Sequence, residues 1–187
     1  TDGGSVETLT LQSGTGTTTF SSGLGTGDAD MLSAVTVTNA GPTSFNGAVN
    51  LSGALTQTNA ATGLTTFANT VSVGSADLKG TTFAVNNSFG SGGTTAFDNS
   101  GLLTKSATGA VTSTGAFSTT GDVNLAQNIT TTDTNLQIGG ALTLAEASTV
   151  TLSTGSGTAG NITLSGSVDG TDGGSVETLT LQSGTGT

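Results

Sequence analysis

Pairs of apolar residues, each pair separated by one polar residue, recur along the whole chain between clusters of Gly, Asn, Asp and Ser. In an extended strand such a pair points to one face and the residue between points to the other. The flanking clusters are typical of tight turns. The pattern therefore predicts many short strands whose paired side chains stack in a core. The pairs are Leu9/Leu11, Val35/Val37, Val49/Leu51, Val71/Val73, Phe83/Val85, Val123/Leu125, Leu136/Ile138, Leu142/Leu144, Val150/Leu152 and Ile162/Leu164.

Two other classes of structure fit the composition less well. Helices are disfavoured because Gly and β-branched Thr interrupt every window and no apolar stripe at helical spacing survives. Disorder is an alternative, since Leu, Val, Phe and Ile make up only 40 of 187 residues. Disordered chains are usually rich in charge and Pro, whereas this chain has 7% charged residues and one Pro.

A glycine-led hexapeptide gives the strands a spacing. "GAVNLS" begins at Gly47, "GDVNLA" at Gly121, "GALTLA" at Gly140 and "GNITLS" at Gly160, so the last three copies follow one another at steps of 19 and 20. A second phase aligns "TSFNGAVNL" with "TTFANTVSV" at a shift of 22, and Phe89 falls a further 22 along. Overall the spacing varies between roughly 19 and 26, so loops of different length must project between turns.

Spacings near 20 predict an all-β fold, a parallel β-helix (β-solenoid) of about 20–22 residues per turn that forms a continuous rod. Each turn would pair its strands with those of the turn below, stack like side chains inward and leave Thr and Ser outward. The alternative β architecture is a series of antiparallel sandwich domains, which normally bury aromatic residues and lack a recurring hexapeptide.

Residues 1–17, "TDGGSVETLTLQSGTGT", recur identically at 171–187. This recurrence predicts that 1–170 is one period of a tandem array and that 171–187 starts the next period. With about 8 turns per period and a rise near 4.8 Å per turn, each period would advance roughly 38 Å. The expected partner is therefore the chain itself, continued head to tail.

The charge balance argues against several partners. The only cations are Lys79 and Lys105, and 12 carboxylates give a net charge of −10. Nothing here could neutralise nucleic-acid phosphates or anionic lipid. No apolar run approaches the ~20 residues of a membrane helix, so we expect no membrane insertion.

Catalytic groups are scarce, because the chain has no His, Cys or Tyr and both of its basic residues are Lys. Asp28 and Asp30 in "GDAD" would share one strand face and could act as the paired carboxylates of a glycan-cleaving enzyme. Such a site also needs aromatic or Arg side chains for its substrate. We therefore expect no enzymatic activity and no cofactor, and Asp28→Asn or Asp30→Asn would test the alternative.

Calcium is a further use of the acidic turns. Asp28 and Asp30, or Asp169 and Asp172 in "VDGTDGG", could supply hard oxygen ligands. The glycine-rich nonapeptide of calcium-binding β-rolls is absent, and two Asp residues seldom bring six oxygens together. These four residues are the candidates for calcium ligands. The preferred interpretation is nevertheless that the chain has no specific metal site.

Polar residues between the apolar pairs could form outward ladders. Flat Thr ladders on a solenoid could bind ice through Thr8/Thr10, Thr36/Thr38 and Thr130–Thr132. Asn ladders would stiffen the stack if their amides aligned. The residues expected to align are Asn50, Asn124 and Asn161.

The segments "GDVNLA", "GALTLAEAS" and "GNITLSGSV" resemble the repeats of filamentous-haemagglutinin-like bacterial exoproteins and related giant β-solenoid adhesins. The resemblance loosely covers most of residues 45–181 and implies a right-handed parallel β-helix, an extracellular location at the cell surface, and roles in adhesion or fibre formation. It leads us to expect a secreted structural repeat, a stiff rod for surface attachment or filament formation with a host or neighbouring cell or a polysaccharide as its target. The alternative is a carbohydrate- or ice-binding module that uses flat Thr and Asn ladders.

Overall fold

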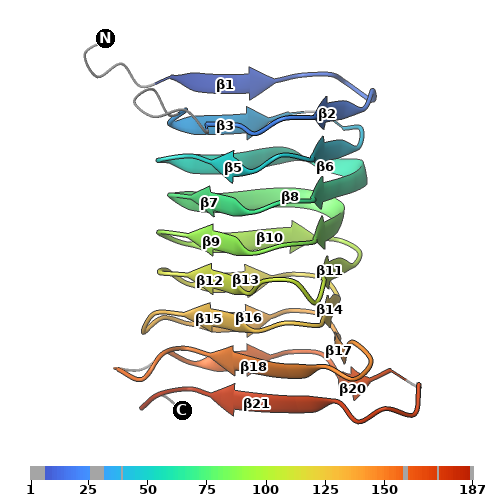
Figure 1. Cartoon of the computed structure of the whole chain (residues 1–187), viewed down its shortest axis with the longest axis vertical. Helices are drawn as coiled ribbons and strands as arrows, with labels where there is room; N and C mark the ends of the chain where they lie inside the picture. The colour runs from blue at the N-terminus through green and yellow to red at the C-terminus, as the bar shows by residue number, and fades with distance from the viewer. Residues whose placement is uncertain (1–6, 26–31, 39, 158–159, 172, 186–187) are drawn as a thin grey trace.

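The protein is a column of parallel β-strands stacked along one axis (Figure 1). A computed structural model describes residues 7–25, 32–38, 40–157, 160–171 and 173–185. Within these residues there is no helix, and every strand pairing is parallel. The predicted all-β parallel solenoid is confirmed, and an antiparallel sandwich is excluded.

Three faces, visited in a fixed order, enclose the core. Face 1 contains β1 (Thr8–Leu11), β3 (Ala34–Val37), the first part of β6 (Ala54–Phe67), the first part of β8 (Ser75–Val85), β10 (Thr95–Asn99), β13 (Phe117–Thr119), β16 (Leu136–Ile138) and β19 (Ile162–Leu164). Face 2 contains β2 (Thr18–Phe20), β4 (Thr43–Phe45), the last parts of β6 and β8, β11 (Leu103–Lys105), β14 (Val123–Leu125), β17 (Leu142–Leu144) and β20 (Val168–Gly170).

Face 3 is a separate seven-stranded sheet. Leu24, which bridges to Val49, extends this face toward the N-terminal end. Its strands are β5 (Val49–Asn50), β7 (Val71–Val73), β9 (Phe89–Ser91), β12 (Val111–Ser113), β15 (Ile129–Thr131), β18 (Thr149–Ser153) and β21 (Thr178–Gln182).

The register agrees with much of the predicted spacing. Phe45 pairs with Phe67 and Val49 with Val71, which is the 22-residue shift between "TSFNGAVNL" and "TTFANTVSV". Val123 pairs with Leu142, which is the 19-residue step between the hexapeptides at Gly121 and Gly140.

The other two hexapeptides do not mark successive turns. "GNITLS" forms β19 on face 1 and pairs with β16, whereas "GALTLA" forms β17 on face 2 and pairs with β20. "GAVNLS" forms β5 on face 3. The predicted 20-residue step from Gly140 to Gly160 is therefore wrong. The motif specifies a glycine turn followed by a short strand, and this local structure can form on any of the three faces.

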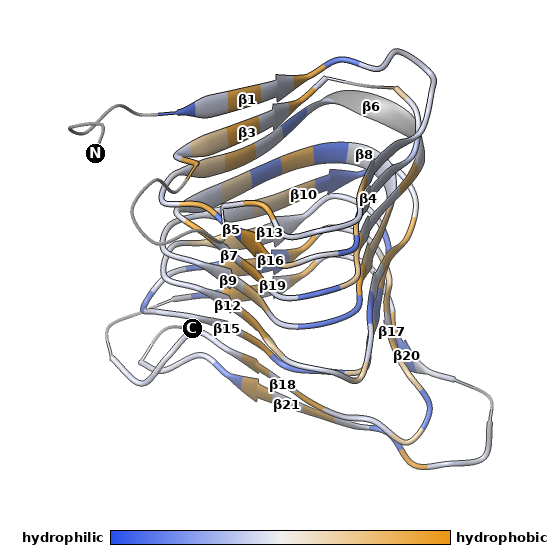
Figure 2. Ribbon diagram, turned by 45° about the horizontal axis from the view of Figure 1, so that its top comes forward, coloured by the Kyte–Doolittle hydropathy of each residue, from blue (hydrophilic) through white to orange (hydrophobic). Residues whose placement is uncertain are grey.

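The core between the three faces is mainly apolar and continuous along the stack (Figure 2). Thr and Ser do not all point outward as predicted, because Thr43, Thr65 and Ser113 take inward positions and are buried. Val35, Val49 and Val123 are each at most 1% exposed, because another turn lies above and below them. At the two ends of the stack the paired residues Leu9, Leu11, Ile162 and Leu164 are only partly buried. The remaining predicted stacking residues also lie in this core: Val37, Leu51, Val71, Val73, Leu125, Leu142 and Leu144.

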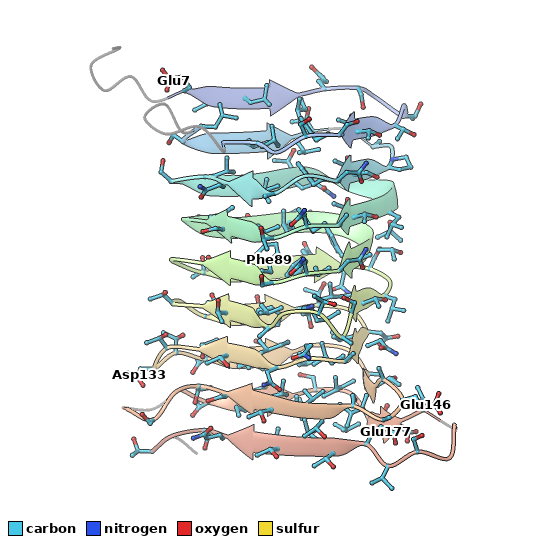
Figure 3. All side chains as sticks on the ribbon, viewed as in Figure 1. Glu7, Phe89, Asp133, Glu146 and Glu177 are labelled. Atoms are coloured by element: carbon cyan, nitrogen blue, oxygen red, sulfur yellow. The ribbon has the colours of Figure 1, made fainter. Side chains whose placement is uncertain are left out.

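All seven Phe residues of the chain join one series of ring contacts within this core. Phe20, Phe45 and Phe67 stack nearly parallel with centroids 5.1 Å apart. Phe89, labelled inside the column in Figure 3, does not continue that ladder. It lies on face 3, pairs with Val71 and meets Phe67 edge-on at 5.5 Å. The turn from Val71 to Phe89 is shorter than the turn before it, so the second 22-residue step from Phe67 places Phe89 on a different face.

Glycine allows neighbouring turns to approach closely where face 1 meets face 2. A Cβ atom at Gly140 would overlap the backbone of Gly121 and Asp122 in the neighbouring turn, and a Cβ atom at Gly166 would overlap Gly140. The neighbours are backbone atoms already held in the stack, so they cannot move aside as a flexible side chain could.

Gly140→Ala is expected to lower the free energy of unfolding by about 1–3 kcal/mol, the usual range for an overpacked interior. Gly92→Ala is the matched control, since its added Cβ would meet nothing closer than 3.6 Å. Denaturant unfolding of both variants measures the difference. Equal effects of the two substitutions would show that close packing at the Gly140 corner is unimportant.

Candidate functional site

The three predicted Asn residues do not form a ladder. Asn50 lies on face 3 beside Ser72, Asn124 lies on face 2 between Thr104 and Thr143, and Asn161 precedes β19 on face 1. Asn161 instead donates its backbone N–H to Oδ1 of Asn135 at 3.0 Å. The predicted alignment is wrong because similar short motifs fall on different faces.

The outward Thr residues of face 1 align over only part of that face. Thr10, Thr36 and Thr56 are in register on face 1, and the next position in that column is Asp77. Thr8 pairs with Ala34, and Thr130 lies away from this column on face 3.

The outward positions of face 2 form a longer polar column. It runs through Thr19, Ser44, Thr66, Ala84, Thr104, Asn124, Thr143 and Asp169. Most strands of this face have three residues and so present one outward side chain each, which makes the column one residue wide. Such a surface offers hydroxyl and amide groups for hydrogen bonds.

The acidic calcium candidates are only partly within the described structure. Asp28, Asp30 and Asp172 lie outside the described residues. Asp169 is exposed on β20, and its Oδ1 accepts the N–H of Gly170 at 2.9 Å. No group of three or more potential metal-ligating side chains occurs among the residues that the structure describes. Figure 3 shows Glu7 and Asp133 at the periphery of the column.

A hollow of about 470 Å³ lies where face 1 turns into face 2. Lys79 on β8 and Asp98 on β10 are exposed neighbours in register at its wall. Thr120 Oγ1 donates to Asp98 Oδ1 at 3.0 Å. The lining residues are Thr58, Lys79, Gly80, Asp98, Asn99, Ser100, Thr120 and Gly121.

Buried Asn99 holds the backbone of this corner. Its Nδ2 donates to the carbonyl oxygens of Gly101 at 2.6 Å and Asp122 at 3.1 Å, while its Oδ1 accepts the N–H of Gly121 at 3.1 Å. The hollow therefore combines a fixed backbone with one cation, one carboxylate and several hydroxyls. This lining can hydrogen-bond a polyhydroxylated ligand.

Lys105 is a buried cation that the sequence interpretation did not single out. It is 1% exposed and takes an inward position on face 2 between Val85 and Leu125. Its Nζ donates to the backbone oxygens of Thr108 at 2.7 Å and Ser106 at 3.0 Å. Burial lowers the pKa of Lys105 to about 8. The alternation of Leu103 and Lys105 around Thr104 was the available signal, because it places both residues on one face.

The two ends of the column leave strand edges open, and the strands at the two ends lie on different faces. β1 and β21 come from the identical segments 1–17 and 171–187. β1 lies on face 1 and pairs with β3, whereas β21 lies on face 3 and pairs with β18. At the C-terminal end Val168 is 46% and Leu181 is 53% exposed. Open edges with exposed apolar side chains can pair with further strands.

No family model, curated protein or solved structure matches this chain. The residues that the structure describes contain no helix long and apolar enough to cross a membrane.

Proposed function

We propose that the chain is a structural period of an extracellular fibre or giant adhesin, a stiff β-solenoid rod that holds a cell surface or a binding tip at a distance. In this proposal residues 1–170 form one period and 171–187 begin the next. The rod itself needs no catalytic group, cofactor or metal. Its mechanical resistance comes from axial strand pairing on all three faces.

The observation that carries the proposal is the identical segment at the two ends of the stack. In both positions the sequence TLTL forms a parallel strand with one open edge. The first copy pairs with the turn that follows it and the second copy with the turn that precedes it, so this sequence can pair with a strand on either side. The exposed apolar residues at the C-terminal end support continuation, because another turn would bury them. The resemblance to filamentous-haemagglutinin-like repeats supports the extracellular role.

A protein of three consecutive periods is expected to be a rod that grows by a constant increment with each period, about 37 Å at a rise near 4.8 Å per turn. Small-angle scattering and electron microscopy of one-, two- and three-period proteins would measure that increment. Separate globules joined by linkers, with no constant increment, would contradict the rod. Antibody labelling of intact source cells tests the surface location independently.

A second function, polysaccharide binding, is favoured by the hollow beside Lys79 and Asp98. Its hydroxyl and charged groups, on a corner whose backbone is held by Asn99, suit hydrogen bonding to sugars. Asp98→Ala is expected to weaken binding to a responsive polysaccharide at least tenfold, whereas Asp77→Ala, on the same face but outside the hollow, should not. Binding assays against a polysaccharide panel measure both effects, and equal affinities would exclude the hollow as the site.

A further inference from the structure

The length of the proposed period does not correspond to a whole number of solenoid turns. Seven successive pairings on face 1 lead from β1 to β19. The chain then passes through β20 on face 2 and reaches β21 on face 3. The second copy of the TLTL strand is therefore seven turns and two further faces from the first, and the proposed period does not complete a whole number of turns.

We propose that successive periods join one face out of step, so that each period is rotated by a third of a turn about the axis relative to the one before. This inference rests on the proposed tandem rod. The occupant of the open C-terminal end is the rest of the next copy, the period that begins at residue 171. In the numbering of the first period, its residues 18–20 would lie on β19, its Leu24 on β20 and its residues 34–37 on β21.

The register for this junction already exists within the structure. β1 pairs with β3 through Leu9 with Val35 and Leu11 with Val37. Because β21 has the same sequence, Leu179 and Leu181 would take Val35 and Val37 of the next period as partners. Leu181 is 53% exposed at the open end, and this pairing would cover it.

The order of the faces then determines the rest of the junction. The chain always passes from face 1 to face 2 to face 3 and back to face 1. In the first period β1 on face 1 is followed by β2 on face 2. After β21 on face 3, the same following segment must lie on face 1. Every strand of the second period keeps its neighbours but changes face.

The rotation has a consequence for the rod. The hollow beside Lys79 and Asp98 would point in three directions in three successive periods and return to its first direction in the fourth. A bend caused by an irregular turn would likewise be distributed around the axis and would not accumulate on one side. The rod would therefore be straight on average and would present its surface features to all sides.

Paired spin labels can test this rotation, because the chain has no Cys and introduced cysteines would be unique. Two outward residues on consecutive strands are suitable: Thr112 on face 3 and Ser118 on face 1. In a two-period protein, one label replaces Thr112 of the first period (Thr112→Cys). The second label replaces either Thr112 (Thr112→Cys) or Ser118 (Ser118→Cys) of the second period.

The proposal expects Ser118 of the second period to lie eight turns from Thr112 of the first on the same side, about 38 Å away along the stack. Thr112 of the second period would lie on another side, so the Thr112–Thr112 distance would be the longer of the two. A shorter Thr112–Thr112 distance would overturn the rotation while leaving the rod intact. Broad distributions for both pairs would overturn the continuous rod and the rotation together.

A second set of labels guards against a local disturbance at Ser118. Thr104 of the first period lies on face 2, and Thr112 of the second period is expected on that side. The Thr104–Thr112 distance should then be shorter than the Thr104–Thr104 distance. The opposite order in this set would also overturn the rotation. Circular dichroism of each labelled protein verifies that the β-structure is retained.

Discussion

Phe67→Ala is expected to lower the free energy of unfolding by about 3–5 kcal/mol. Phe67 is fully buried, and its ring lies between Phe45 at 5.1 Å and Phe89 at 5.5 Å. Removing the ring leaves a cavity inside a column whose walls are held by axial hydrogen bonds, so the turns cannot collapse to fill it. The substitution also breaks the series of ring contacts that connects the N-terminal turns to the middle of the rod. Denaturant unfolding of the 187-residue chain measures the loss.

Leu64→Ala is the control on the same strand, because Leu64 is 44% exposed. Its effect is expected to stay within about 1 kcal/mol, as at most surface positions. Phe67→Leu, which keeps most of the apolar volume, should fall between the two alanine variants. Similar losses for Phe67→Ala and Leu64→Ala would contradict a core held together by stacked rings.

Alkaline pH is expected to stabilise the protein. Burial lowers the pKa of Lys105 from 10.5 to about 8, so between these values the unfolded chain binds a proton that the folded chain has lost. Stability therefore rises as the pH increases from about 8 to about 10.5, and it is lowest with respect to this group below pH 8. At 1.36 kcal/mol per pKa unit the gain is about 3 kcal/mol. Urea unfolding at several pH values in this range measures it.

The composition of the chain leaves few other groups that could contribute to this pH dependence. The chain has no Tyr and no Cys, and its two basic side chains are both Lys, so few other groups titrate in the same range. Lys105→Met should abolish the increase, whereas Lys79→Met, at an exposed position on β8, should retain it. A wild-type stability that stays constant from pH 8 to pH 10.5 would show that Lys105 is not held in a desolvated site.

Sequence alone was sufficient to predict the parallel solenoid and the strands that carry a pair of apolar residues. It did not predict strands such as β12 and β15, in which a polar residue takes one of the inward positions. The alternation of apolar and polar residues in segments such as Val35–Val37 decides which side chains point inward, and this depends on neighbours two residues apart. The regular recurrence of these segments then favours stacking of each turn on the one before. The 22-residue step from Phe45 to Phe67 and the 19-residue step from Val123 to Leu142 needed no further information.

The face on which each strand lies was decided only by the tertiary structure. TLTL forms a strand at both 8–11 and 178–181, yet it lies on face 1 in one place and on face 3 in the other. Strand formation is local, whereas the face depends on the summed lengths of all preceding loops and on how each turn closes over the one below. The same reason explains why the Asn residues do not align, and why only the closed column shows Lys105 to be enclosed.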